Sequence, residues 1–284
     1  MTIDYDKLMN YSIPEVSQRY TRRDSAFYAL SVGFGQEPMD ARQLRFVDPD
    51  RKNFCAVPSM AVVLGAPAFW LGEPDTGVDA NKLVHGEQSI RLYQPLPAEG
   101  EVVGTTRVTS IIDKGPGKGA LLYSTKTLVD AHSGKKLIDS TSTVFLRADG
   151  GFGGPTGPVR QPAPVPTAAP DMVCEFATRP EQALYYRLNG DYNPLHSDPE
   201  TAKRAGFAKP ILHGLCTFGV ICHGLLRLLA DYDAAALREV EMRFTAPVTP
   251  GETIRIEAWR NGSFRAWSVE KEVIVANNGL CKLA

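Results

Sequence analysis

The chain has 284 residues and a formal net charge of −1 at pH 7, with 31 Lys and Arg against 32 Asp and Glu. This length exceeds one ordinary domain and can bury substantial cores, so we expect two units of similar size. The balanced charge gives no electrostatic case for nucleic acid or an anionic membrane as a partner.

The cysteines and the two ends of the chain bear on where the protein is located. Five cysteines, an odd number without metal-ligand spacing, predict buried thiols. The first 14 residues lack a basic and apolar signal pattern, and no apolar run approaches the length of a membrane span. The C-terminal CKLA is not an S-K-L-type ending. We therefore expect a soluble cytoplasmic protein.

An internal repeat gives the organisation of the chain. Residues 21–28, TRRDSAFY, precede Gly33, and residues 178–185, TRPEQALY, precede Gly190 at a constant offset of 157 residues. Both segments predict amphipathic helices. Residues 91–96 match residues 243–248 at an offset of 152. The chain therefore contains one unit twice.

Each unit is expected to end in strands, because alternation of apolar and polar residues follows its last helix. The predicted strands are 86–94, 101–112, 120–130, 136–147, 238–246, 252–260, 265–276 and a short end near 280. Residues 149–170 are rich in glycine and proline and predict a linker between units 1–148 and 171–284. One helix against an antiparallel sheet, repeated, is an α+β architecture.

The stretch 184–219 holds the candidate chemistry. Asp191 and His196 lie in one short loop and form an acid/base pair that can deliver one proton while removing another. Asn193 and Pro194 favour a tight turn that makes the two side chains converge. A predicted helix over 211–231 follows.

Gly214 lies in the first turn of that helix, where backbone N–H groups have no intrahelical partner and suit an oxyanion. Taken alone, D-x-N-P-x-H can equally be a structural turn, and His213 can be a residue that simply precedes the helix. His132 is expected in a surface turn and His223 in the core. No spacing indicates a metal site.

The whole stretch resembles the hydratase 2 signature of the MaoC-like dehydratases, the R-specific enoyl-CoA hydratases, in which a tyrosine-led helix runs into G-D-x-N-P-L-H. Here the pattern runs from Tyr185 through Gly190 to His196, and continues to His213 and Gly214. The similarity extends over nearly the whole chain, towards the hydratase 2 domain of the peroxisomal multifunctional enzyme of fatty acid β-oxidation. It implies a double hotdog fold and an acyl-CoA substrate without a cofactor.

The resemblance also implies roles for individual residues. It implies four catalytic residues: Asp191, His196, Asn193 and Gly214. It implies that the substrate is bound by His85, Gly86, Lys114, Tyr192, Pro194, Leu195, His213 and Phe244. Lys114 and Lys118 lie in a glycine-rich turn, DKGPGKG, where a lysine can meet a phosphate as a point charge.

The expected reaction is hydration of a trans-2-enoyl-CoA whose carbonyl lies on the Gly214 N–H. We expect His196 to take a proton from water and Asp191 to relay or supply one to C2. The pair can titrate as a unit, so the alternative is the reverse assignment, with Asp191 as base and His196 as acid. The (3R)-3-hydroxyacyl-CoA product follows from the resemblance.

The first repeat has lost this chemistry. Its segment equivalent to the helix 211–231 is interrupted by Gly65, Pro67, Gly72, Pro74 and Gly77, and an internal proline costs a helix about 3 kcal/mol. We expect no full central helix there. The loss predicts a groove for a medium, long or bulky acyl chain, lined by residues such as Phe69 and Trp70. The alternative is that 65–81 forms a covering loop.

Three other functions are possible on this fold. A non-catalytic acyl-CoA binding protein would keep the groove but lose Asp191 or His196. A hotdog thioesterase would release free CoA. A dehydratase acting on acyl carrier protein would need a basic docking face, which the balanced charge does not indicate. By analogy with paired hotdog units, we expect a homodimer.

Overall fold

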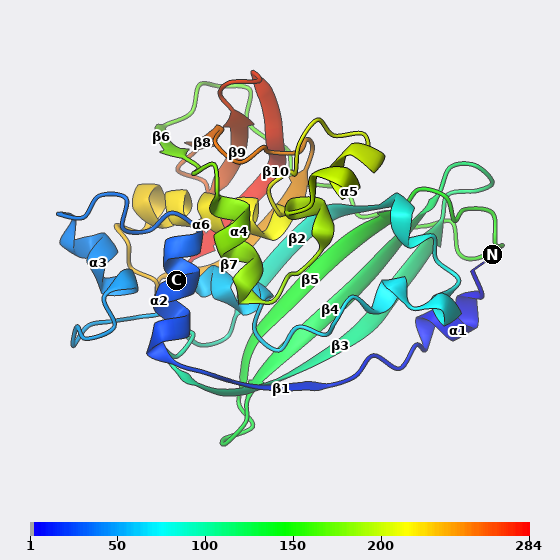
Figure 1. Cartoon of the computed structure of the whole chain (residues 1–284), viewed down its shortest axis with the longest axis horizontal. Helices are drawn as coiled ribbons and strands as arrows, with labels where there is room; N and C mark the ends of the chain where they lie inside the picture. The colour runs from blue at the N-terminus through cyan, green and yellow to red at the C-terminus, as the bar shows by residue number, and fades with distance from the viewer. Residues whose placement is uncertain (1–2) are drawn as a thin grey trace.

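The computed structural model describes residues 3–284. Its strands form one antiparallel sheet in the order β1-β3-β4-β5-β2-β7-β10-β9-β8-β6, and the sheet curves about the helix α6 (Figure 1). The first half of the chain supplies β1 (Val16–Tyr20), β2 (Leu83–Leu92), β3 (Gly100–Asp113), β4 (Ala120–Asp130) and β5 (Lys136–Leu146). The second half supplies β6 (Met172–Ala177), β7 (Leu237–Phe244), β8 (Thr253–Ala258), β9 (Ser263–Ser268) and β10 (Val273–Leu283). Pairing of β2 with β7 joins the halves.

Most predicted strands are present within a few residues, but one was wrong. The segment predicted as a single strand over 265–276 is two strands, β9 and β10, separated by a turn at 269–272. Glu272 has a φ of 55° there, and the turn contains neither glycine nor proline, so the sequence carried no turn signal. The predicted short end near 280 belongs to β10. The edge strands β1 and β6 were not predicted.

The repeated helix differs between the two copies. In the first copy α2 (Arg22–Ser31) begins with a capping box between Thr21 and Asp24. In the second copy α4 (Gln182–Tyr186) is followed by a single 3-10 turn, η5 (Arg187–Asn189). The Thr178 hydroxyl donates instead to the Glu252 carbonyl at 2.6 Å, so it does not cap a helix. The second predicted helix is therefore much shorter than the first.

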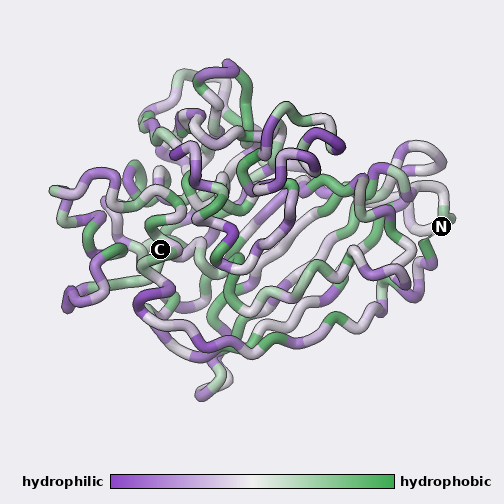
Figure 2. The backbone as a smooth tube through the Cα atoms, in the orientation of Figure 1, coloured by the Kyte–Doolittle hydropathy of each residue, from purple (hydrophilic) through white to green (hydrophobic). Residues whose placement is uncertain are grey.

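The central helix α6 (Gly214–Leu229) forms the core of the molecule, within the range predicted. Eleven of its sixteen residues are buried, and it packs against β6, β8 and the inner face of the sheet. Hydrophobic residues gather along the segments through the middle of the molecule (Figure 2). Gly219 permits the close approach of α2, because an added Cβ would lie 2.5 Å from Val32.

The first copy has only a 3-10 helix, η1 (Pro58–Val62), where the second has α6, which confirms the predicted loss of a full central helix. Lys126 of β4 caps it: its Nζ donates to the carbonyls of Ala61, Val62 and Leu64 at 3.0, 2.9 and 2.5 Å. The chain then turns at Gly65, whose φ is 56°. An added Cβ there would lie 2.9 Å from the backbone of Gly104.

The segment after Gly65 covers part of the sheet. It contains η2 (Trp70–Gly72), η3 (Pro74–Thr76) and η4 (Ala80–Lys82), and it packs with α1 (Tyr5–Met9) over the inner face of β3, β4 and β5. The Trp70 ring stacks on Tyr11 with centroids 5.5 Å apart, whereas Phe69 is 61% exposed. The remaining helices are α3 (Ala41–Val47), η6 (Pro194–His196) and α5 (Pro199–Arg204). Within residues 3–284, no helix is long and apolar enough to cross a membrane.

Candidate active site

The loop between α4 and α5 is held in place by its own side chains. Gly190 ends η5 with a φ of 116°, a conformation that favours glycine. The Asp191 carboxylate accepts a hydrogen bond from the Asn193 N–H at 3.3 Å. Asn193 Oδ1 accepts from the Leu195 N–H at 3.0 Å and so caps η6. The predicted tight turn is present, and its capping orients His196.

His196 is arranged as a base. Its Nδ1 lies 2.8 Å from the Ile211 carbonyl oxygen. A carbonyl only accepts, so Nδ1 carries the hydrogen and Nε2 keeps a free lone pair in the neutral ring. Burial lowers the pKa of His196, while the Ile211 carbonyl and the Asp191 carboxylate oppose that shift. The ring is therefore neutral and able to accept a proton at pH 7.

His213 is the second imidazole of the site. It precedes α6 and stacks on His196 with ring centroids 3.8 Å apart. Its Nε2 donates to the Asp191 backbone carbonyl at 3.1 Å. Burial and then the neighbouring His196 lower the pKa of His213 to about 4. Its Nδ1 is buried and has no hydrogen-bond partner among residues 3–284. His213 thus helps to build the site and does more than precede the helix.

Asp191, His196 and His213 place possible ligand atoms within 4.8 Å of one another, a grouping for which the sequence spacing gave no signal. The two imidazole rings are inclined by only 29°. Imidazole lone pairs lie in the ring plane, so near-parallel stacked rings do not direct them at one metal ion. The geometry fits proton transfer better than coordination.

Both halves of the chain contribute to the site. Gly214 is the first residue of α6, and a Cβ added to it would lie 3.5 Å from the Phe244 ring of β7. His85 of β2 lies 4.9 Å from the same ring. Burial lowers the pKa of His85 to about 4, and the nearby Asp191 carboxylate opposes the shift. The structure therefore brings His85, Phe244 and Gly214 together.

Lys114 lies farther away, in the turn between β3 and β4. Its Nζ is 5.7 Å from the Phe145 ring centroid, and the strand register puts Phe145 next to Val144, the partner of His85. Lys114 and His85 therefore lie at the same end of the sheet. The buried Asp113 carboxylate fixes this turn by accepting hydrogen bonds from backbone N–H groups, including that of Gly115.

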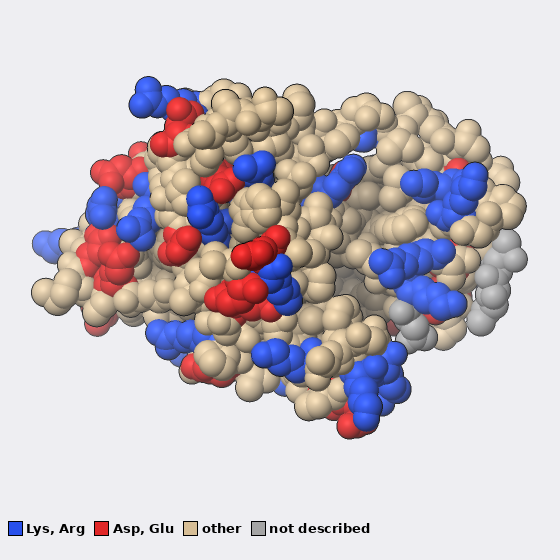
Figure 3. Space-filling view, turned by 90° about the horizontal axis from the view of Figure 1, so that it is seen from above, with Lys and Arg blue, Asp and Glu red and all other residues tan. Residues whose placement is uncertain are grey.

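The other predicted substrate-binding residues lie at the outer edge of the site. Tyr192 and Pro194 are exposed and Leu195 is partly buried. Arg187 lies 5.4 Å above the Tyr192 ring. Seen from above, the molecule is hollowed to the right of its middle, and Lys and Arg side chains gather to the right of the hollow (Figure 3).

Two contributors escaped the sequence reasoning. The Ile211 carbonyl fixes the tautomer of His196 through its backbone, which leaves no residue-type signal. The Tyr186 ring packs against the His213 ring with centroids 5.0 Å apart. Its place directly after Tyr185, the first residue of the recognised motif, was the available clue.

Comparison with known proteins identifies the family. Residues 18–148 match the MFE-2 hydratase 2 N-terminal domain and residues 155–280 match the MaoC like domain. The chain is 40% identical over 266 residues to a probable enoyl-CoA hydratase 2 of Dictyostelium discoideum, covering 92% of this chain and 88% of that protein. It is 38% identical over 271 residues to a peroxisomal enoyl-CoA hydratase 2 of Arabidopsis thaliana, covering 90% and 87%.

A crystal structure of a MaoC-like dehydratase from Phytophthora capsici superposes with a TM-score of 0.88 at 32% identity, covering 99% of this chain and 98% of that one. The structural similarities confirm the predicted double hotdog fold. The chain belongs to the MaoC-like dehydratase family, in its hydratase 2 branch, as the motif from Tyr185 to His196 indicated.

Proposed function

We propose that the protein is an enoyl-CoA hydratase 2, which adds water reversibly to a trans-2-enoyl-CoA to give a (3R)-3-hydroxyacyl-CoA. The observation that carries this is the state of His196: Nδ1 is committed to the Ile211 carbonyl, which leaves Nε2 free, and the ring lies within 4.8 Å of the Asp191 carboxylate, measured between possible ligand atoms. The relatives named enoyl-CoA hydratase 2 support the same reaction and its stereochemistry.

The reaction needs a proton acceptor, a proton donor and an oxyanion site. The thioester carbonyl lies on the Gly214 N–H, where the free helix end stabilises the enolate-like charge that develops. His196 Nε2 removes a proton from water as the oxygen bonds to C3. Asp191 accepts that proton from His196 and relays it to C2. The oxygen and one hydrogen of the water end on C3 and the other hydrogen ends on C2, so both side chains return to their starting state.

The surrounding elements suggest where the CoA and the acyl chain of the substrate bind. Lys114 meets the CoA phosphates, and His85 and Phe244 lie against the thioester. The acyl chain runs toward the first repeat, which lacks a central helix, so medium, long or bulky chains fit. Trp70 stacks on Tyr11 and helps to cover the sheet, as the alternative of a covering loop over 65–81 predicts.

The direct test is the loss of enoyl-thioester absorbance with crotonyl-CoA and with C10 to C16 enoyl-CoA, followed by chiral analysis of the product. Hydration of the longer substrates to the R product supports both the reaction and the acyl groove. No absorbance loss with any chain length, in folded protein that binds acyl-CoA, contradicts the hydratase and leaves a binding protein. Release of free CoA from a saturated acyl-CoA, detected by a thiol reagent, identifies a thioesterase.

We also propose a homodimer and a cytoplasmic location. The homodimer is supported by the common pairing of hotdog units, and light scattering of the purified chain tests it. Fractionation of the source cells tests the location.

A further inference from the structure

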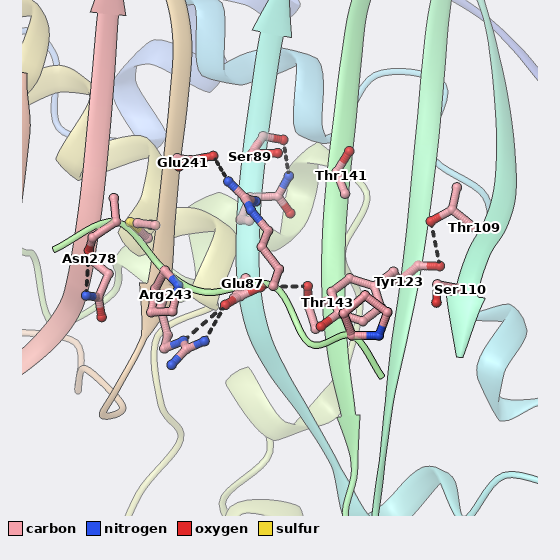
Figure 4. Close-up of a pocket in the computed structure, with 16 residues that line it drawn as sticks. Glu87, Ser89, Thr109, Ser110, Tyr123, Thr141, Thr143, Glu241, Arg243 and Asn278 are labelled. Atoms are coloured by element: carbon pink, nitrogen blue, oxygen red, sulfur yellow. Dashed lines mark hydrogen bonds and ion pairs between the residues drawn. The ribbon is translucent and has the colours of Figure 1, made fainter. Parts of the chain in front are cut away.

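The outer face of the sheet carries a polar cavity of about 290 Å³ at the seam where β2 pairs with β7. Figure 4 shows Glu87 near its middle, between Arg243 and Thr143. Glu87 Oε1 accepts from Arg243 Nε at 3.0 Å and Nη2 at 2.7 Å, and Oε2 accepts from the Thr143 hydroxyl at 2.9 Å. One carboxylate therefore ties together three neighbouring strands, β5, β2 and β7.

Glu87 lies next to a β-bulge. His85 pairs with Val144 of β5, and Glu87 pairs with the adjacent residue Thr143, so Gly86 is an extra residue in β2. Neighbours on β5 point to opposite faces of the sheet, and paired residues share a face. His85 and Glu87 therefore point to opposite faces, although residues two apart in a regular strand share one. The bulge turns His85 inward to the site while Glu87 stays outside.

The β7 side of the seam has the same division. Arg243 faces outward to Glu87, and the next residue, Phe244, faces inward. There the Phe244 ring lies against His85 and Gly214. The outer ion pair and the inner pair of rings are thus carried by the same short segments of backbone.

Glu87 also fixes His85 through its backbone. His85 Nε2 lies 3.1 Å from the Glu87 carbonyl oxygen, so it donates a hydrogen bond and Nδ1 keeps the free lone pair of the neutral ring. The side chain of Glu87 binds Arg243 of β7, and the backbone carbonyl of Glu87 fixes the His85 ring.

We propose that Glu87 is a positioning residue for the hydration reaction: its ion pair with Arg243 holds the bulge at Gly86, and thereby holds His85 and Phe244 against the thioester. This rests on the proposed function, which places the thioester at those rings. Without the ion pair, only the backbone pairing of Glu87 with Arg243 holds the bulge to β7, and both rings lose part of their fixed orientation. Small displacements of this kind slow catalysis by factors of ten to a hundred.

A matched control exists on the same seam. Arg91 and Glu239 also pair between β2 and β7, at 3.2 Å, but lie away from the bulge. We expect E87Q to lower kcat about ten-fold or more with KM changed less than about two-fold, because orientation is lost and not binding. E239Q should leave kcat and KM unchanged, although its Tm should fall about as much as that of E87Q. Equal kcat for the two variants, or a kcat that simply follows Tm, overturns the proposal.

A second measurement does not depend on activity. ¹⁵N NMR of the His85 ring should show the hydrogen on Nε2 in the wild type and a mixture of tautomers in E87Q. If wild-type protein does not hydrate enoyl-CoA, the proposed function fails. The NMR comparison still tests whether the Glu87–Arg243 ion pair fixes the orientation of the His85 ring. An unchanged His85 tautomer in E87Q overturns it. If E87Q does not fold, R243Q breaks the same pair from the β7 side, and the same outcomes decide.

Discussion

The imidazole rings of His196 and His213 stack 3.8 Å apart although one belongs to η6 and the other precedes α6. Burial lowers the pKa of both rings, and for His213 the nearby His196 lowers it further. Two protonated rings at this distance would repel, so the pair accepts one proton at a time. That property suits a base that must take a proton from water and release it in each turnover.

The buried histidines make the fold sensitive to acid. The pKa of His213 is about 4 in the folded state, below the ordinary value of 6.5. Between these values the unfolded chain binds more protons, so the free energy of unfolding falls as the pH falls from 6.5 to about 4. The loss of stability that comes from His213 reaches roughly 3 kcal/mol below about pH 4, and there is no such loss above pH 6.5.

Urea unfolding at a series of pH values from 7 to 4.5 checks this. H213Q should flatten the dependence on pH, whereas H132Q, at an exposed turn position, should leave it unchanged. An unaltered slope in H213Q would contradict the assignment.

Loss of either member of the acid/base pair should remove most of the activity. We expect D191N and H196Q each to lower kcat by about 100-fold or more, the usual contribution of a positioned acid or base. The absorbance assay measures kcat, and circular dichroism checks that the fold is intact. H132Q serves as the control. Near-normal turnover in a folded D191N or H196Q would remove these residues from the mechanism.

Two glycines of α6 should separate activity from stability. A Cβ at Gly214 makes only ordinary contact with the Phe244 ring at 3.5 Å, so G214A should fold at least as well as the wild type. The methyl group fills the space beside the proposed oxyanion site, and kcat/KM should fall about ten-fold or more.

G224A should do the opposite. Its Cβ would lie 2.9 Å from Ile256 and 3.1 Å from Cys174, which costs about 1–3 kcal/mol of stability. Thermal melts and kinetics on both variants make the comparison. Full activity in G214A would argue against the Gly214 N–H as the oxyanion site.

Lys126 should be essential for the first half of the fold. Its ammonium satisfies three buried carbonyls at the end of η1. In K126M those carbonyls lose their donor, and we expect a loss of about 3 kcal/mol or more in urea unfolding. K135M, in an exposed turn, is the control. Equal stability of the two variants would show that the carbonyls find other partners.

Lys114 should matter only for the nucleotide end of the substrate. We expect K114M to raise KM for enoyl-CoA several-fold, because the proposed phosphate contact would be lost. KM for the same enoyl group on N-acetylcysteamine, which has no phosphate, should not change. Steady-state kinetics with both substrates decide. A similar rise for both would mean that Lys114 acts on the thioester end or on the fold.

The local pattern of the chain was sufficient for much of the site. The run from Asp191 to His196 predicted a tight turn, and the structure has it. Asn193 Oδ1 caps η6 by accepting from the N–H of Leu195, only two residues further along the chain. The helix beginning at Gly214 and the loss of its counterpart in the first repeat also follow from short-range rules on apolar spacing, glycine and proline. By contrast, the turn at 269–272 was missed because its residues carry no such signal.

The amino-acid sequence alone determined the family, the repeated unit and the candidate acid/base loop, since these rest on residue types at short spacing. Only the tertiary structure decided that His213 stacks on His196, that the Ile211 carbonyl fixes the tautomer of His196, and that His85 faces inward. The physical reason is that these arrangements depend on backbone carbonyls and on strand register. Both are set when distant segments pack together, and neither leaves a mark on the type of residue at a position.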